Sequence, residues 1–521
     1  MPSYAPTLLG STTPRIWTRP KVTGPPGPCG CGCALTPATS KGFSAINFAR
    51  DVLEVEPLPW QRWLLIHALE LRRDGRFRYR TVLMMVGRQN GKTTIVEVKN
   101  LWKLYVLKVG LVIGTAQNLD LSEESWDKAV EIAESIPDLA AEIAHVDRTN
   151  GKKALKLTHG SRWKIAAASR KGGRGFPADD VNLDELREHQ SWDSWAAVSK
   201  TTMARREAQV WAFSNAGDDK SVVLNDLQAK GRAAAEHGGD PAFGMFEWSV
   251  PDDVRCNCLR PPGAAHLSDC MLQDRRYWAM ANPSLGYTIT EEAIAAALST
   301  DPDAVFLTEC LCQHVQSMEP DWQVIPESDW VLAEDPTRER ADGARPAFCL
   351  DMAPDRSWAA IFAAWERPDG LQQIEVIDCQ PGIGWIPRRF EALKEHNPCA
   401  VVVARDSPAS SEVPMLEALG LEVKRMSVPD SVAGSGMLFD GIAGAVGDDP
   451  DVPSPRRVRH SGQADLSTGI RKATKHPPED KAWSFDRARP FGWQVKGIVG
   501  GLWGLNTFVE EPVQQFFAAW R

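Results

Sequence analysis

Apolar runs alternate with amphipathic stretches in the first two-thirds of the chain. Thr81–Val86 predicts a buried strand, Lys92–Leu107 predicts the helix that follows it, and Leu111–Thr115 predicts the next strand. Strands and helices that alternate in this order build a parallel sheet with helices on both faces. The pattern between about residues 45 and 235 therefore predicts an α/β domain.

A second series of apolar stretches begins near Pro346 and has a different order. The pattern predicts three consecutive strands, a helix and a fourth strand, at Ala347–Met352, Trp358–Trp365, Leu371–Asp378, Ile386–Glu395 and Ala400–Ala404. This β-β-β-α-β order is typical of an RNase H-like fold. We therefore expect the last third of the chain to form a domain of its own.

A polar, proline-containing stretch from Glu319 to Arg345 separates the two series and indicates an interdomain linker. With 521 residues, the chain is too long for a single hydrophobic core. The predicted organisation is a flexible arm at 1–44, an α/β domain at 45–320, a linker at 321–345, an RNase H-like domain at 346–510 and a tail at 511–521.

The composition and net charge of the chain argue against several classes of protein. Hydrophobic residues make up 43% and charged residues 24% of the chain, and no apolar run approaches the roughly 20 residues of a membrane span. The stretch Met1–Thr23 lacks the apolar core of a secretory signal, so we expect a cytoplasmic protein without a membrane anchor. A net charge of −9 argues against a protein that simply coats nucleic acid, although local basic patches can still grip DNA. Eleven cysteines, an odd number, fit reduced thiols.

A glycine-containing turn connects the first predicted strand to its helix. It reads Gly87-Arg88-Gln89-Asn90-Gly91-Lys92-Thr93-Thr94. Glycines let backbone amides curl around phosphate oxygens, and a helix N-terminus favours negative charge. Lys92 can reach the phosphates and Thr93 can ligate Mg²⁺. The spacing from Gly87 to Gly91 is one residue shorter than in the usual P-loop, but we expect the whole turn to bind a nucleotide.

Acidic and polar groups follow at the ends of two later strands. Asp184 suits the support of Mg²⁺, and Glu185 suits the polarisation of an attacking water. The apolar strand Gln209–Phe213 ends in Ser214-Asn215-Ala216-Gly217, whose polar groups can sense the γ-phosphate. The side-chain amide of Gln61 can read an adenine edge, although taken alone Gln61 would be interpreted as a surface residue.

Together these motifs resemble the large terminase subunit of tailed bacteriophages, the motor that pumps DNA into a procapsid and cuts it to length. The resemblance covers roughly residues 45 to 505. It identifies Trp60-Gln61 with the adenine-reading motif and Arg88–Thr93 with the deviant Walker A motif of that family. Asp184-Glu185 corresponds to the Walker B motif and Ser214–Gly217 to the coupling motif.

The resemblance implies an arginine finger that acts across subunits. Arg174, within Gly172–Phe176, is our first choice, Arg88 the second and Arg170 the third. A guanidinium group there would stabilise charge on the transferred phosphoryl group, whereas the alternative for Arg174 is an ordinary basic loop. The expected partners are double-stranded DNA, a small terminase subunit, a portal and a procapsid, with a homo-oligomeric ring forming on docking.

Two carboxylates carry the chemistry predicted for the RNase H-like domain. Asp351 lies near the end of its first strand and Asp406 follows its fourth strand, and these strands are neighbours in this fold. Carboxylates suit two Mg²⁺ or Mn²⁺ ions that hydrolyse a phosphodiester. Relatives tend to carry a third Asp directly before the final helix, where this chain has Phe491-Gly492-Trp493. Asp486 is the nearest substitute, Asp480 the next, and Asp355 can assist; the alternative for each is a solvated loop carboxylate.

Two groups of cysteines have metal-binding chemistry. Cys256, Cys258, His266 and Cys270 can supply four tetrahedral zinc ligands, and the competing interpretation is an inserted loop with free thiols. Cys29-Gly-Cys31-Gly-Cys33 supplies too few well-placed ligands alone, so disorder is the preferred interpretation there. We expect Cys310, Cys312 and His314 to be packing residues.

The leading hypothesis is a viral genome-packaging enzyme of the host cell cytoplasm, both an ATPase and a metal-dependent DNA endonuclease. ATP hydrolysis would drive DNA translocation, and the C-terminal domain would cleave concatemeric DNA. The alternatives are a helicase-nuclease of DNA repair or of a mobile element, and a nucleotide-regulated assembly protein with an inactive nuclease domain.

Overall fold

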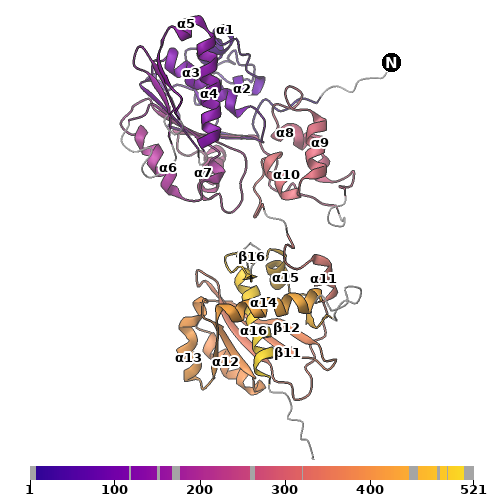
Figure 1. Cartoon of the computed structure of the whole chain (residues 1–521). Helices are drawn as coiled ribbons and strands as arrows, with labels where there is room; N and C mark the ends of the chain where they lie inside the picture. Colours follow the sequence, from indigo (N-terminus) through magenta and orange to yellow (C-terminus); the bar gives the residue numbers. More distant parts are fainter. Residues whose placement is uncertain are drawn as a thin grey trace, which may run out of the picture. The chain divides into compact units, whose positions relative to one another are not determined.

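The structure is a computed structural model that describes residues 8–116, 119–149, 153–166, 177–258, 265–318, 321–444, 456–477, 482–489 and 491–509. The chain forms two compact units, Met1–Glu319 and Pro320–Arg521, and both are mixed α/β structures (Figure 1). Among the described helices, none is both long enough and apolar enough to cross a membrane.

A nine-stranded sheet forms the centre of the first unit. Its strands are β1 (Ile16–Trp17), β2 (Thr81–Met85), β3 (Leu111–Ala116), β4 (Ile143–Asp147), β5 (Ala154–Leu157), β6 (Arg162–Ile165), β7 (Asp180–Asp184), β8 (Gln209–Ser214) and β9 (Phe243–Glu247). Their spatial order is β1-β9-β2-β8-β7-β3-β6-β5-β4, and the central strands from β9 to β6 run parallel. The strand β8 therefore separates the P-loop strand β2 from β7, as in ATPases of the RecA and ASCE type.

Helices cover both faces of this sheet, which confirms the predicted α/β fold. They are α1 (Gly42–Asp51), α2 (Pro59–Ala68), α3 (Lys92–Tyr105), α4 (Leu119–Ser135), α5 (Pro137–Ala140), α6 (Trp192–Ser199) and α7 (Val222–His237). Alternate residues of β2 enter two different cores: Val82 and Met84 pack with residues of α1 to α4, whereas Leu83 and Met85 pack with residues of α6 and α7. This alternation follows from the two-residue period of a strand.

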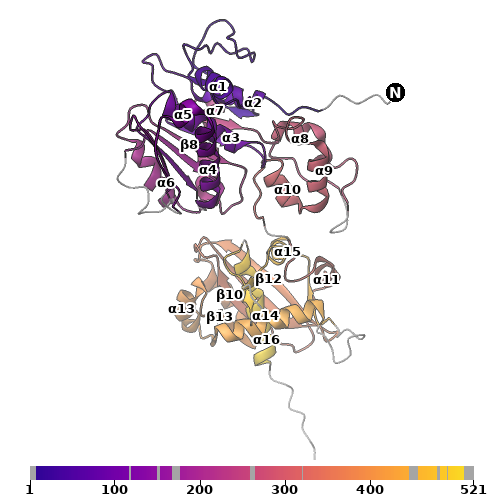
Figure 2. The same ribbon diagram turned by 45° about the horizontal axis from the view of Figure 1, so that its top comes forward.

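A small helical lobe beside the sheet contains α8 (Arg275–Ala281), α9 (Glu291–Thr300) and α10 (Asp303–Glu309) (Figure 2). It has a hydrophobic core of its own, which includes Trp278, Ile294 and Phe306. The chain enters the lobe after β9 and returns from it at Glu309, close to the P-loop. A backbone hydrogen bond from Arg88 to Glu309 therefore links the end of the lobe to the P-loop.

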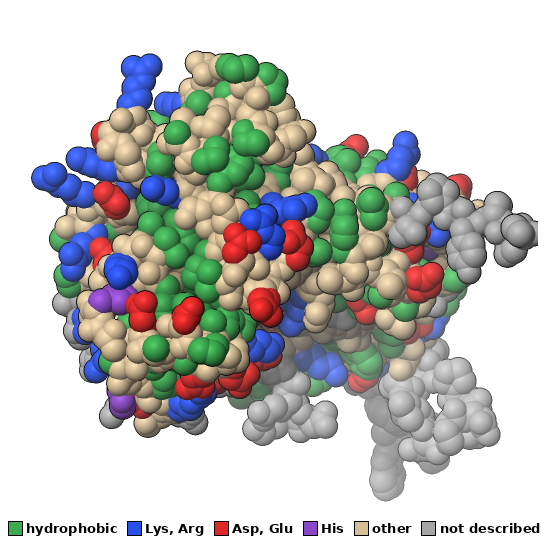
Figure 3. Space-filling view, turned by 90° about the horizontal axis from the view of Figure 1, so that it is seen from above, with side chains coloured by type: hydrophobic (Ala, Val, Ile, Leu, Met, Phe, Trp, Pro, Cys, Tyr) green, Lys and Arg blue, Asp and Glu red, His purple; other side chains and the backbone are tan. Residues whose placement is uncertain are grey.

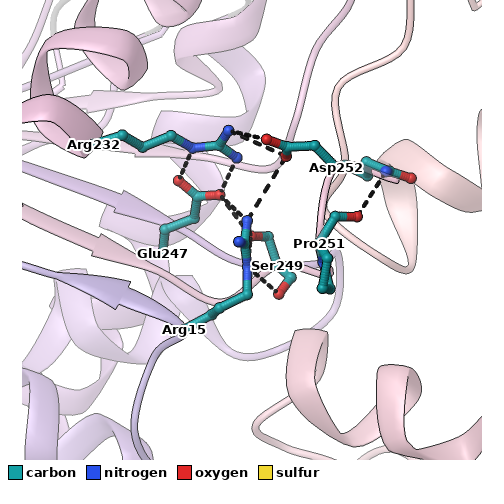
Figure 4. Close-up of polar contacts among 7 residues, drawn as sticks. Arg15, Arg232, Glu247, Ser249, Pro251 and Asp252 are labelled. Atoms are coloured by element: carbon teal, nitrogen blue, oxygen red, sulfur yellow. Dashed lines mark hydrogen bonds and ion pairs between the residues drawn. The ribbon is translucent and has the colours of Figure 1, made fainter. Parts of the chain in front are cut away.

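The structure differs from the flexible arm expected at residues 1–44. From Leu8 onward the chain is described, β1 pairs with β9, and Leu35 is fully buried. Figure 4 shows how Arg15 reaches the end of β9, where its Nε donates to the Ser249 carbonyl oxygen at 3.0 Å. Arg232 clasps the fully buried Glu247 beside it, with a distance of 2.6 Å between Nη2 and Oε1. Apolar and ionic contacts, which composition does not predict, order this segment.

Acidic and basic side chains are interspersed with apolar ones on the face shown in Figure 3. No continuous basic band crosses the described part of that face. This arrangement agrees with the net charge of −9.

The second unit contains a six-stranded sheet and a two-stranded sheet. The strands are β10 (Ala347–Met352), β11 (Trp358–Glu366), β12 (Gln372–Pro381), β13 (Ala400–Ala404), β14 (Val423–Met426), β15 (Val458–His460), β16 (Lys475–His476) and β17 (Ser484–Phe485). The large sheet has the order β14-β13-β10-β11-β12-β15; β10, β11 and β12 are antiparallel, and β13 is parallel to β10. This topology confirms the predicted RNase H-like fold.

Helices also cover both faces of the larger sheet. They are α11 (Glu327–Leu332), α12 (Ile386–Leu393), α13 (Val413–Ala418), α14 (Val428–Ala443), α15 (Ala464–Arg471) and α16 (Gly492–Phe508). Glycines bring α16 close to the sheet, because a Cβ at Gly497 would lie 2.1 Å from the ring of Phe362. Part of the expected linker also packs here: Trp330 of α11 is buried and stacks on His460, which a separate linker would not do.

Candidate functional site

The P-loop turn lies between β2 and the first residue of α3, as predicted. Gly91 precedes the helix with a φ of +88°, and Gln89 has a φ of +63°. These left-handed conformations fold the turn back above the N-terminus of α3, whose free amides favour an anion. Thr93 is exposed and Thr94 partly exposed in the first turn of the helix. The turn therefore has the form of a phosphate cradle.

Asn90 belongs to the scaffold of this turn. Its side chain is fully buried, and Nδ2 donates to the carbonyl oxygen of Gly87 at 3.0 Å and to Oδ1 of Asn282 at 2.9 Å. Its Oδ1 accepts from the backbone amide of Ser284 at 3.0 Å. Gly87 is equally confined, since a Cβ there would lie 2.9 Å from Asn282 Oδ1. The P-loop is thus fastened to the segment that follows α8.

The predicted Walker B carboxylates, Asp184 and Glu185, lie at the end of β7, next to Lys92. Nζ of Lys92 is 3.8 Å from Oε1 of Glu185, and this ammonium is buried with no hydrogen-bond partner in the described residues. Asp184 accepts from the Glu185 amide at 3.0 Å. Burial raises the pKa of Asp184, and the nearby charge of Lys92 opposes part of that rise. A buried ammonium between two acids is an arrangement suited to a phosphate and its counterion.

Glu185 has an unusual backbone conformation. Its φ is +49°, a left-handed value that costs a non-glycine residue about 1–2 kcal/mol. Such strain persists where neighbouring contacts fix the backbone, and it is common at active sites. The conformation turns the chain from β7 into the short 3-10 helix Leu186–Glu188.

The amide of Gln61 contacts the P-loop itself. Nε2 donates to the carbonyl oxygen of Gly91 at 3.0 Å, and Oε1 accepts from the amide of Leu58 at 2.8 Å. Gln61 is 3% exposed, so it is not the surface residue that its position alone suggests. These bonds fasten α2 to the end of the P-loop, and the reading of adenine stays a prediction.

The predicted coupling segment, Ser214–Gly217, contacts two residues that the sequence analysis did not single out. Oγ of Ser214 accepts from the backbone amide of Arg187 at 3.1 Å, and Nδ2 of Asn215 donates to Oε2 of Glu309 at 2.9 Å. Arg187 pairs with the other Glu309 oxygen at 2.5 Å and lies 3.4 Å from Glu185. The backbone carbonyl of Glu309 also accepts from the Arg88 amide at 2.7 Å. Glu309 thus joins the helical lobe to both the P-loop and the coupling segment.

We expect Glu309→Gln to lower ATP turnover by about tenfold or more, because a charged hydrogen bond contributes roughly 1.5–3 kcal/mol. Without that charge, Arg187 would pair more strongly with Glu185, the candidate base. Phosphate release gives the rate, and binding of a fluorescent ATP analogue should change little. Glu292→Gln, an exposed substitution on α9, serves as the control in the same lobe. Equal rates for the two variants would remove Glu309 from this role.

The first and third choices for the arginine finger, Arg174 and Arg170, lie outside the described residues. Arg88, the second choice, has a side chain that is 61% exposed, and its Nη1 lies 3.6 Å from Oε2 of Glu309. It occupies the rim of the P-loop, and the identity of the finger stays a prediction.

The RNase H-like unit brings Asp351 and Asp406 together, with two cations between them. Asp351, on β10, is 1% exposed and accepts from Arg487 at 2.5 Å and from Ser407 Oγ at 2.5 Å. Asp406, after β13, lies 3.8 Å from Arg487 and 3.4 Å from Lys496 of α16. Burial lowers the pKa of Arg487, but the charge and hydrogen bond of Asp351 raise it further, so the net direction is upward. Neither cation was singled out from the sequence.

Asp486 forms contacts of its own. One oxygen accepts from the amide of Ala488 at 2.9 Å, and the other lies 3.6 Å from Nε of Arg489. Asp355 accepts from Ser357 within its own turn. Among the described residues, no third carboxylate joins Asp351 and Asp406 in a group close enough to share an ion. Asp480 lies outside the described residues, and the assignment of Asp486 stays a prediction.

The predicted zinc ligands converge beside the helical lobe. Nδ1 of His266 lies 3.5 Å from the sulfur of Cys256, 3.7 Å from that of Cys258 and 3.3 Å from that of Cys270. On the other side of the ring, Nε2 lies 3.3 Å from a carboxylate oxygen of Asp303. A carboxylate behind a histidine is the usual outer support of a zinc ligand.

Comparisons with known proteins give several solved structures that are similar to this chain. The large terminase of bacteriophage HK97 is 17% identical, covers 89% of this chain and 99% of its own, and has a TM-score of 0.42. The ATPase domain of the Thermus phage P74-26 large terminase is 16% identical, covers 51% and 97%, and has a TM-score of 0.36. The large terminase nuclease of thermophilic phage G20c is 15% identical, covers 33% and 87%, and has a TM-score of 0.24. No protein-family model and no curated protein matches the chain.

Proposed function

We propose that the chain is the large subunit of a phage terminase, a motor that hydrolyses ATP to move double-stranded DNA into a procapsid. One observation carries the proposal: a P-loop sheet with Lys92 beside Glu185 precedes an RNase H-like sheet in the same chain. A helicase would instead be expected to continue with a second RecA-like sheet. The order of these two units therefore favours a packaging motor over a helicase-nuclease.

The residues around Lys92 fit ATP as the substrate. Its buried ammonium would meet the β- and γ-phosphates, while the N-terminus of α3 accepts their charge. Glu185 would take the proton of the attacking water. Thr93 and Asp184 would hold Mg²⁺, which neutralises phosphate charge when bound. Gln89 and Asn90 shape the turn, and the exposed side chain of Arg88 lies at its edge.

The contacts at the end of β8 offer a route from hydrolysis to movement. Asn215 and Arg187 both hold Glu309, and Glu309 is the last residue of α10. Glu185 and Glu309 both lie within ion-pair distance of Arg187. A change in the charge near Glu185 would therefore alter how strongly Arg187 pairs with Glu309. We infer that the helical lobe shifts with each turnover. Its partners would be double-stranded DNA, a small terminase subunit, and a portal on which the chain forms a ring.

ATP-dependent displacement of a third strand from linear duplex DNA tests the motor. We expect the wild-type chain to displace it only with ATP, and Lys92→Ala to reduce displacement to the level without ATP. Lys156→Ala, an exposed substitution on β5, should behave like the wild type. Displacement by Lys92→Ala at the wild-type rate would exclude this mechanism.

The second unit would cut the DNA that the motor moves. Asp351 and Asp406 support this proposal, since the Oδ2 atom of Asp351 is buried and lacks a hydrogen-bond partner in the described residues. The arrangement does not fit two divalent ions as it stands, because Arg487 and Lys496 already balance the two carboxylates. Two-metal cleavage, with Asp486 as a third ligand, would require both cations to leave.

The same cations favour a second candidate, an assembly protein whose RNase H-like unit no longer cuts. A buried carboxylate paired with a guanidinium is a structural contact in many proteins. The two candidates differ in one observable, which is the metal-dependent cleavage of plasmid DNA.

We also propose that Cys256, Cys258, His266 and Cys270 hold a structural Zn²⁺. Their ligand atoms all lie within 4.8 Å of one another, and three sulfurs with one imidazole nitrogen form a common zinc ligand set. The ion would close the loop after β9 onto the lobe, where Cys270 is buried.

A further inference from the structure

Three thiols of the N-terminal segment point toward one another. The sulfur of Cys29 lies 2.7 Å from that of Cys31 and 3.1 Å from that of Cys33. Gly30 and Gly32 alternate with these cysteines and have φ angles of +78° and +84°, values that other residues rarely adopt. The left-handed glycines curl the segment so that its thiols gather. Both sulfur separations exceed the roughly 2.0 Å of a disulfide bond.

A histidine from another element completes the group. Nε2 of His67, near the end of α2, lies 3.5 Å from the sulfur of Cys31, although the two residues are 36 positions apart. All four ligand atoms lie within 4.8 Å of one another. Tetrahedral zinc bonds of about 2.3 Å to sulfur would place two sulfurs about 3.8 Å apart. The thiols of Cys29 and Cys31, now 2.7 Å apart, would therefore separate by about 1 Å on binding the ion. The missing fourth ligand of the sequence motif is therefore present in the fold.

The ring of His67 is fixed in the form that a metal requires. Its Nδ1 lies 2.7 Å from the carbonyl oxygen of Trp63, so Nδ1 carries the hydrogen and Nε2 keeps the lone pair toward the thiols. The ring stacks on Trp63, with centroids 3.7 Å apart, and meets the edge of Trp17 at 5.1 Å. His67 is 1% exposed. Packing has thus oriented the imidazole before any ion binds.

We propose that Cys29, Cys31, Cys33 and His67 bind a structural Zn²⁺ that fastens the N-terminal segment to α2. Three thiolates and one imidazole favour zinc over Mg²⁺ or Ca²⁺, which take oxygen ligands. Zn²⁺ would displace the thiol protons to solvent and form three sulfur bonds and one nitrogen bond, with no change in oxidation state. Because Gln61 of α2 is bonded to Gly91, the ion stabilises the helix that supports the P-loop.

Zinc content of the purified full-length chain tests the proposal. If both cysteine groups are occupied, the wild type should carry about two zinc ions per chain. Cys31→Ser and Cys256→Ser should each lose about one ion, and the double variant should lose both. Cys399→Ser removes a thiol outside both groups, and its zinc content should equal that of the wild type.

The variant Cys256→Ser separates this site from the one beside the lobe. The zinc that it retains should show sulfur and nitrogen ligands in a ratio of about three to one by X-ray absorption, a reading that needs no substitution in the N-terminal group. His67→Gln, introduced into Cys256→Ser, should then release that ion. The inference fails if Cys256→Ser carries no zinc, if His67→Gln leaves its zinc unchanged, or if mass spectrometry finds Cys29, Cys31 or Cys33 in a disulfide.

Discussion

Replacement of Glu185 by glutamine is expected to lower the rate of ATP hydrolysis by roughly 10²–10⁴-fold, the usual contribution of a positioned general base. Glutamine keeps the size of the side chain and its contacts at the end of β7, but it cannot accept a proton from water. The carboxylate lies 3.8 Å from the ammonium of Lys92 and has a backbone fixed in a left-handed conformation. Phosphate release in the presence of double-stranded DNA measures the rate.

Binding of a fluorescent ATP analogue distinguishes loss of chemistry from loss of the site. We expect Glu185→Gln to bind the analogue at least as tightly as the wild type, because Lys92 loses a competing acid. Glu188→Gln is the matched control, since this exposed acid lies three residues further along and also contacts Arg187. Turnover in Glu185→Gln close to that of the control would assign the base to another residue.

The candidate nucleotide site could be predicted from sequence because most of the residues that form it are close together in the chain. The turn Gly87–Thr94 joins a strand to a helix, and both elements were visible as an apolar run and an amphipathic period. Parallel strands end at one edge of a sheet, so Asp184 and Ser214 had to lie near the P-loop. The order of strands in the RNase H-like unit followed from the same kind of pattern and placed β10 beside β13.

Contacts between distant residues were beyond the reach of these patterns. Arg187 and Glu309 are 122 positions apart, and neither belongs to a motif. His67 lies on an ordinary amphipathic helix, where a histidine gives no signal of a metal. The periodicity of apolar residues shows which face of a helix or strand is buried, but it does not show which residue of another element that face contacts. Only the packing of α2 against the N-terminal segment reveals that His67 faces three thiols.

In the RNase H-like unit the predicted fold is confirmed, whereas the predicted two-metal site is not. Its two acids meet as expected, yet Arg487 and Lys496 bring as much positive charge as the acids bring negative. Arg487 directly follows Asp486, the residue predicted as the third acid, and Lys496 lies in the first turns of α16. A cation at such a place favours the ionised form of the two carboxyl groups in the absence of metal, and it competes with a metal ion for them.

The loss of Mn²⁺-dependent plasmid cleavage in Asp351→Ala is the second large effect that we expect. If Mn²⁺ displaces Arg487 and Lys496 from the two carboxylates, the wild-type chain should nick and linearise the plasmid. Asp351→Ala should reduce cleavage to the background, because it removes the buried carboxylate that shares Arg487 with Asp406. Asp440→Ala, an exposed substitution on α14 outside the proposed site, should cut like the wild type. Gel analysis over time measures cleavage, and thermal unfolding of each variant shows whether its RNase H-like unit is folded.

The variant Arg487→Ala tests whether Arg487 competes with a metal ion or forms a structural contact with Asp351. If Arg487 competes with metal, its removal should increase the rise in the melting temperature that Mn²⁺ produces, since a metal that binds only the folded state stabilises it. Cleavage should then increase as well. If the wild type, Arg487→Ala and Asp351→Ala are all inert while ATP hydrolysis persists, the unit is not a nuclease, and the pairing of Asp351 with Arg487 is a structural contact within an assembly protein.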